Sequence, residues 1–123
     1  MPIVVRAFPI RRPLEELNAF AATLATERRA EADQFYRHYG VSHESWHLQQ
    51  TPTGPWLIGV TRVDEPEVAA AQYAKAPEAF DAWFRAQVLH LSGIDPAVQP
   101  LGPPTTMIFS WSDSQRPQSN LCA

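Results

Sequence analysis

The sequence is poor in the residues that define several classes of site. Its only cysteine, Cys122, stands next to the last residue, and Lys75 is its only lysine. A single thiol excludes a disulfide framework or a thiolate metal cluster within the chain, and it favours a cytoplasmic setting. Acidic residues outnumber basic ones by 13 to 10, and no basic run exceeds two residues. Nucleic acid and anionic membranes, which attract concentrated positive charge, are therefore disfavoured as partners.

Long apolar runs are also missing. The N-terminal stretch Ile3–Ile10 is interrupted by Arg6 and is far shorter than the roughly 20 residues that cross a bilayer. It also lacks the layout of a signal peptide. What remains is 123 residues with 45% hydrophobic side chains, an ordinary globular composition that can form one core. We assign a single domain to residues 1–112 and a polar C-terminal tail to residues 113–123.

Residue patterns in the first half predict a strand, a helix and a hairpin. The first strand is rich in β-branched residues, and Pro13 suits the first turn of the helix that follows. Apolar residues at a spacing of three and four then continue to a glycine that is suited to ending a helix. The predicted elements are a strand over Ile3–Ile10, one long helix from Pro13 to Gly40, and hairpin strands over Glu44–Thr51 and Trp56–Val63.

The second half predicts a broken helix and a last strand. Asp64-Glu65-Pro66 forms a helix start, and the helical pattern continues to Gly93 with a break at Pro77. The proline-rich stretch that follows cannot be regular structure for long. Thr105–Trp111 then alternates large apolar residues with other residues, which predicts a fourth strand.

The stretch APEAFDAWF, Ala76–Phe84, in which a proline precedes an aromatic helix face, resembles the second helix of the ferredoxin-like dimeric α+β barrel superfamily. The element order over Ile3–Trp111 resembles the same superfamily, which includes cofactor-independent antibiotic-biosynthesis monooxygenases and many uncharacterised bacterial proteins. The resemblance implies an α+β fold of order β-α-β-β-α-β, with a four-stranded antiparallel sheet and both helices on one face. Haem is a lesser possibility under the same resemblance.

That topology leaves the second face of the sheet uncovered. Here both faces carry apolar and aromatic residues, and a large exposed apolar patch is rarely tolerated on a monomer. Pairing two sheets across a two-fold axis is a common solution. We therefore expect a homodimer through the open sheet face, with pockets between that face and nearby loops or the second chain.

The candidate site combines a polar row with aromatic walls. Alternation along Glu44–Thr51 places His47 and Gln49 on one strand face, and Arg6 is a polar insertion in an apolar strand. Near one another, these groups could bind a small aromatic or acidic metabolite, with His47 as general base. The residues expected to bind the ligand are Arg6, Gln49, Trp56, Tyr73 and Trp83.

Two alternatives stay open beside this site. The same polar groups could hydrogen-bond across the dimer interface or face solvent, which makes the protein a non-catalytic dimerisation module. A metal site is disfavoured, because His43 and His47 lie about 13 Å apart if both are on a strand. We therefore expect no metal and no cofactor.

Overall fold

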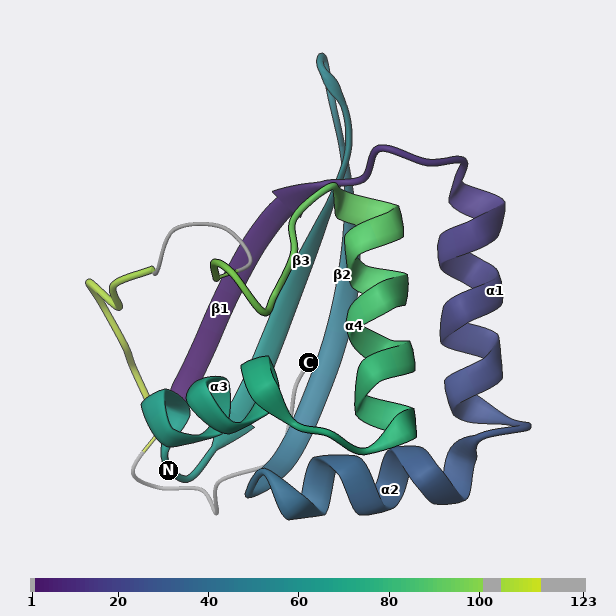
Figure 1. The fold of residues 1–123 in the computed structure, drawn as a ribbon. Coiled ribbons are helices and arrows are strands. Elements are labelled where there is room, and N and C mark those ends of the chain that lie inside the picture. Colours follow the sequence, from purple (N-terminus) through teal and green to yellow (C-terminus); the bar gives the residue numbers. More distant parts are fainter. Residues whose placement is uncertain (1, 101–104, 114–123) are drawn as a thin grey trace.

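The computed structural model describes residues 2–100 and 105–113. In these residues a three-stranded antiparallel sheet is covered on one face by four helices (Figure 1). No helix in this part of the chain has both the length and the apolar character needed to cross a membrane. The elements are β1 (Ile3–Pro9), α1 (Leu14–Ala25), α2 (Arg29–His38), β2 (Val41–Thr51), β3 (Gly54–Val63), α3 (Pro66–Lys75) and α4 (Ala79–Ser92).

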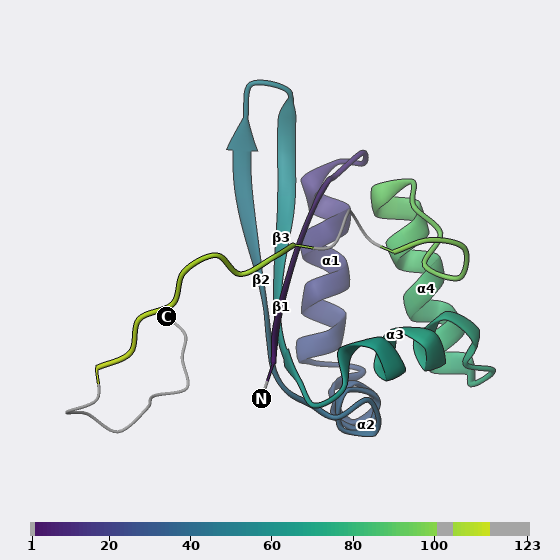
Figure 2. The same cartoon turned by 90° about the vertical axis from the view of Figure 1, so that its left-hand side faces the viewer.

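The sheet has the strand order β1-β3-β2, so the central strand comes from the second half of the hairpin. Arg6 pairs with Gly59, which in turn pairs with Trp46, and two positions along the strands the buried Phe8 pairs with the buried Leu57. These side chains share one face because the strand period is two residues. Figure 2 shows all four helices on that face and none on the other.

The core is built largely from aromatic rings on three of the helices. Phe35 of α2 stacks on Phe84 of α4 with ring centroids 4.7 Å apart, and Phe20 of α1 meets the same Phe84 edge-on at 5.1 Å. All three rings are buried. Because helix α3 has no buried residue, α1, α2 and α4 carry most of the packing against the sheet.

The expectation of one long helix from Pro13 to Gly40 is wrong. The helix ends at Ala25, and a second one begins at Arg29 and runs crosswise to the first (Figure 1). The hydroxyls of Thr23 and Thr26 donate to backbone carbonyls four residues earlier, at 2.9 and 2.7 Å. Such bonds compete with regular helix geometry, and Thr26 leaves it with φ −128° and ψ −87°.

The break expected at Pro77 is confirmed. Helix α3 ends at Lys75 and α4 begins at Ala79, so the proline lies in the short connection between them. Helix α4 ends at Ser92, and the next residue, Gly93, has a φ of 76° in the left-handed region and donates its N–H to the Leu89 carbonyl at 2.8 Å. This is the glycine stop that the sequence indicated.

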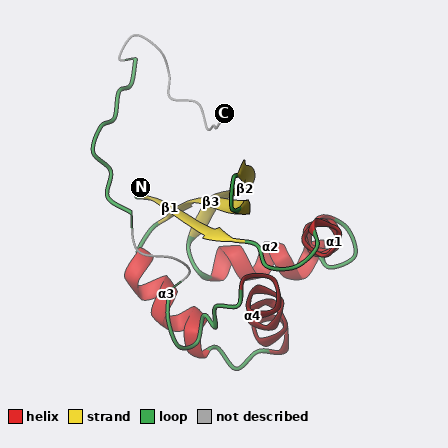
Figure 3. Cartoon of the chain, turned by 90° about the horizontal axis from the view of Figure 1, so that it is seen from above, coloured by secondary structure: helices red, strands yellow, loops and turns green. Residues whose placement is uncertain are grey.

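The expected ferredoxin-like β-α-β-β-α-β fold is wrong, because Thr105–Trp111 is not a strand in this structure. Within residues 2–100 and 105–113 there are four helices and a three-stranded sheet, in the order β-α-α-β-β-α-α. Figure 3 shows residues 105–113 extending from the sheet on the side away from the helices. Alternation alone cannot form a strand, because a strand needs a neighbouring backbone along its length. The tail expected over 113–123 lies outside the described residues, apart from Asp113.

Candidate ligand pocket between the sheet and the helices

A pocket of about 290 Å³ lies between the helix-facing side of the sheet and the helices. Its floor comes from alternate residues of all three strands, and every helix contributes to its walls. Exposed residues Ala70, Gln99 and Pro100 are among its lining, so the pocket reaches the surface between α3 and the segment after α4. Its polar lining includes Arg6, Tyr36, Tyr39, Glu44, Thr61 and Tyr73.

A carboxylate with three hydrogen-bond donors lies at one side of this pocket. The Tyr36 hydroxyl and the Trp46 indole N–H donate to Glu44 Oε2, at 2.6 and 2.9 Å. The Thr61 hydroxyl donates to Oε1 at 3.0 Å. These bonds join α2, β2 and β3 through one side chain. Because the fold itself supplies all three donors, we regard Glu44 as a group that organises the pocket.

The tyrosines around the pocket are held in their neutral form. Burial is the main cause that raises the pKa of Tyr36 above its ordinary value, and the nearby charge of Glu44 raises it further. Burial likewise raises the pKa of Tyr73, although the Arg85 guanidinium opposes this in part. The pKa of Tyr39 is also raised, first by burial and then by its hydrogen bond to the buried Asp81. The three hydroxyls are therefore donors throughout the physiological pH range.

Two donors that line the pocket have no partner among the described residues. They are Nη1 of Arg6 and the hydroxyl of Tyr73, and both atoms are buried. Leaving a buried donor unpaired costs about 1–3 kcal/mol, and more for a charged group. Both groups therefore require an acceptor that is not part of the described chain, such as water or a ligand.

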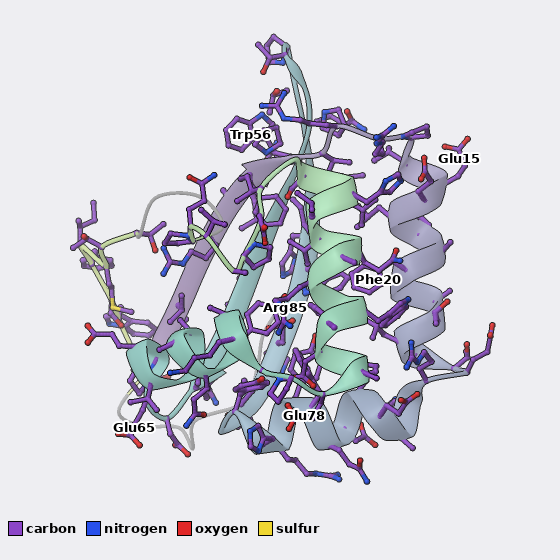
Figure 4. The ribbon with its side chains drawn as sticks, in the orientation of Figure 1. Glu15, Phe20, Trp56, Glu65, Glu78 and Arg85 are labelled. Carbon is purple, nitrogen blue, oxygen red and sulfur yellow. The ribbon has the colours of Figure 1, made fainter. Side chains whose placement is uncertain are left out.

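Helix α3, which carries Tyr73, is fastened to α4 by one arginine. Arg85 donates from Nη1 to the Tyr73 carbonyl and from Nη2 to the Ala76 carbonyl, both at 2.7 Å. Figure 4 shows Arg85 between the two helices. A cation at a helix C-terminus also interacts favourably with the helix dipole. Arg85 thus fixes the position from which the Tyr73 ring enters the pocket.

Gly59 leaves open space in the middle of the pocket floor. It pairs with Arg6 on one side and Trp46 on the other, and a Cβ atom added to it would meet nothing within 4 Å. Its backbone is not in the left-handed region. The glycine is therefore not required by backbone conformation, and its lack of a side chain contributes to the hollow.

The structure brings together only two of the residues expected to form the site. Arg6 and Tyr73 line the pocket, whereas His47 and Gln49 are exposed on the opposite sheet face, where His47 Nε2 is 2.9 Å from Ser45 Oγ. Trp56 pairs with Gln49 and shares that face. It lies at the far end of the sheet from Arg85 (Figure 4).

Trp83 is used in packing rather than in the pocket wall. Its ring meets Phe20 edge-on with centroids 5.4 Å apart, and the Arg28 guanidinium lies 4.2 Å from the ring centroid. It does not belong to the pocket lining. Trp83 therefore does not form a wall of this pocket.

Sequence reasoning missed Glu44, Tyr36 and Thr61. Glu44 is two residues from Trp46, so strand alternation places both on one face and contained the signal. Tyr36 follows Phe35 on the helix, and helical spacing alone did not separate a pocket-facing ring from a core ring. Thr61 carries no sequence signal beyond its place in a strand.

A metal centre finds no support in the described residues 2–100 and 105–113, where no three His, Cys, Asp or Glu side chains gather as a metal ion requires. The arrangement is instead an apolar hollow with a few convergent polar groups, as is usual for small-molecule sites. Comparison with protein-family models, with curated proteins and with solved structures finds no match to this chain.

Proposed function

We propose that this chain is a cytoplasmic protein that binds a small amphipathic acid in the pocket between its sheet and its helices, without a metal. The observation that carries the proposal is the pair of buried, unpartnered donors, Arg6 Nη1 and the Tyr73 hydroxyl, in one mainly apolar hollow. An anionic group satisfies a guanidinium far better than a neutral one does. The apolar lining accommodates an aromatic or aliphatic body.

The charge of the pocket supports an acid rather than a base. Glu44 already accepts three hydrogen bonds, so a cationic ligand would have to compete with donors that the fold supplies. Arg6 forms no ion pair within 4.0 Å among the described residues. A volume of about 290 Å³ is at the lower end of ordinary ligand pockets, which favours a small molecule.

The test compares acids with their neutral amides. Phenylacetate, cinnamate and octanoate, each beside its amide, are added to the wild-type chain and to three variants, and the melting temperature is measured. Arg6→Met removes the cation while keeping a similar stem length, and Gly59→Leu fills the hollow. His47→Ala is the matched control on the opposite sheet face.

We expect at least one acid to stabilise the wild-type chain more than its amide does. Arg6→Met should remove that preference, with roughly a 10- to 100-fold loss of affinity for the acid. Gly59→Leu should abolish binding of acid and amide alike, and His47→Ala should leave both unchanged. The proposal is rejected if no compound stabilises the wild type, or if His47→Ala removes the response and Arg6→Met does not.

A second candidate function is that of a dimerisation module. All helices lie on one side of the sheet (Figure 2). On the other side, the strand register places apolar side chains of β1 and β3 beside the polar row of β2. An apolar centre with a polar rim is the usual anatomy of a protein interface. Sedimentation of the wild-type chain tests this candidate, and a monomer at every concentration would reject it. The apolar side chains on this open sheet face, here called the apolar strip, are those of Val5, Ala7, Trp56, Ile58 and Val60.

A further inference from the structure

Residues 105–111, here called the arm, expose an unusual amount of apolar surface. Ile108 is 94% exposed, Phe109 81% and Trp111 74%, and Met107 is also mainly exposed. The arm is fastened at its first residue, where the Thr105 hydroxyl donates to the Val5 carbonyl of β1 at 2.6 Å. From there it extends away from the sheet on the side opposite the helices (Figure 3).

The same chain also carries an uncovered surface that matches the arm. The apolar strip lies on the open sheet face, and all four helices are on the other side. The arm begins at the edge of that face but does not bury its side chains there in the described structure. One molecule thus has both an exposed apolar arm and an apolar sheet surface that is half-buried and carries no helix.

We propose that the arm of each copy packs on the apolar strip of a second copy, and that the exchange is reciprocal. This inference deepens the dimerisation candidate and rests on it. Because arm and strip belong to the same chain, a two-fold axis satisfies both surfaces in a closed dimer. An unrelated partner would leave one of the two surfaces exposed.

The size of the arm fits this role. Seven extended residues reach about 23 Å at roughly 3.3 Å per residue, which is enough to cross several strands. Aromatic side chains bury about 150–250 Å² each, so the two aromatics of each of two arms remove roughly 600–1,000 Å² from water. With the surface that they cover on the strip, the total reaches the range of about 1,200–2,000 Å² for stable interfaces.

The experiment uses the full chain and measures both mass and connectivity. Sedimentation compares the wild type with the arm double variant Phe109→Ser/Trp111→Ser and with the strip variant Ile58→Glu. Leu89→Ser is the control, because Leu89 is 43% exposed on α4, away from both surfaces. A photoreactive phenylalanine analogue at position 109, illuminated in otherwise wild-type protein, reports whether the arm contacts its own copy or another.

We expect a wild-type dimer, unaffected by Leu89→Ser and weakened about 100-fold or more by the arm variant, since two central aromatics are lost. Illumination should give a covalent product of twice the chain mass. A monomeric wild type overturns the dimerisation candidate together with this inference. A dimer that Ile58→Glu breaks but the arm variant leaves intact overturns the arm exchange alone, as does a crosslink confined within one chain. Circular dichroism establishes that each variant is folded.

Discussion

At the scale of single residues, Glu44 determines how the pocket is organised. Its carboxylate joins a tyrosine of α2, a tryptophan of β2 and a threonine of β3. Oε2 accepts two of these bonds and Oε1 accepts one. A glutamine side chain has one acceptor oxygen and one donor nitrogen. Its oxygen can accept the two bonds that Oε2 accepts, and its nitrogen can donate to the Thr61 hydroxyl, which then accepts instead of donating.

This geometry predicts different costs for two substitutions of Glu44. Glu44→Gln should lower the free energy of unfolding by only about 1 kcal/mol, because the amide replaces every bond and loses only the charge. Glu44→Leu should lower it by roughly 2–5 kcal/mol, because the Tyr36 hydroxyl and the Trp46 N–H are left buried without an acceptor. Urea unfolding of both variants measures the difference. Equal costs would show that the three bonds do not contribute as described.

The residues of the site could be predicted from sequence only in part. Alternation correctly separated Trp46 from His47 within one strand. Alternation could not decide which face of β1 lies on the same side of the sheet as which face of β2. Strand β3 lies between them, and β2 has a register irregularity between Val41 and His43. Arg6 was therefore grouped with His47, although Arg6 shares its strand face with the buried Phe8.

At the scale of elements, α3 is the least anchored helix of the pocket. It has no buried residue, and Glu65, the residue just before it, makes no side-chain capping bond. Its C-terminal end is held by the two bonds from Arg85 to backbone carbonyls. The helix that supplies Tyr73 to the pocket thus depends on a side chain of another helix.

Loss of that side chain should loosen α3 selectively. Arg85→Met is expected to speed amide hydrogen exchange across Pro66–Lys75 while leaving α1 unchanged, because the last carbonyls of α3 lose their donors. Exchange measured by mass spectrometry reports each segment. Arg29→Met is the matched control, since the Arg29–Asp33 pair is largely exposed and should contribute less than about 1 kcal/mol. Uniform acceleration across α1, α3 and α4 in Arg85→Met would contradict this assignment.

The elements differ in how well the sequence predicts them, and the reason is physical. Pro77 breaks a helix through its own ring and missing N–H, so the break between α3 and α4 is readable locally. Thr26 ends α1 through a back-bond that threonine forms in some helices and not in others. The arm has a strand-like pattern, but a strand also requires a partner backbone, which a local pattern does not contain.

At the scale of the whole molecule, all the tyrosines are gathered in one place. The chain has 3 tyrosines, and each of them lines the pocket. They come from α2, from the residue after it and from α3, and burial is the main cause of the raised pKa of every one. Their ionisation is therefore linked to unfolding of the molecule as a whole.

The raised values determine the direction of the pH dependence. Below pH 10, the ordinary tyrosine pKa, both folded and unfolded chains hold these protons, and stability should not depend on them. Above it the unfolded chain loses protons that the folded chain keeps, so the free energy of unfolding should fall. For Tyr36 and Tyr73 the fall is up to about 1.4 kcal/mol per pH unit each.

Alkaline titration followed by phenolate absorbance and by circular dichroism tests this linkage. We expect little phenolate near pH 10 and then a rise that coincides with the loss of secondary structure. Phenolate that forms reversibly while the circular dichroism stays native would contradict it. Free tyrosine amide in the same buffer gives the reference curve.

The four tryptophans give the molecule a set of built-in optical probes, because each stands on a different surface. An indole shifts its fluorescence emission according to the polarity around it, so a chain that keeps one tryptophan, with the others replaced by phenylalanine, reports on one surface alone. Ligand entry should then shift the emission of the chain that keeps Trp46. Self-association should shift the emission of the chains that keep Trp56 or Trp111. The positions are Trp46 in the pocket, Trp56 on the open sheet face, Trp83 against α1 and Trp111 on the arm.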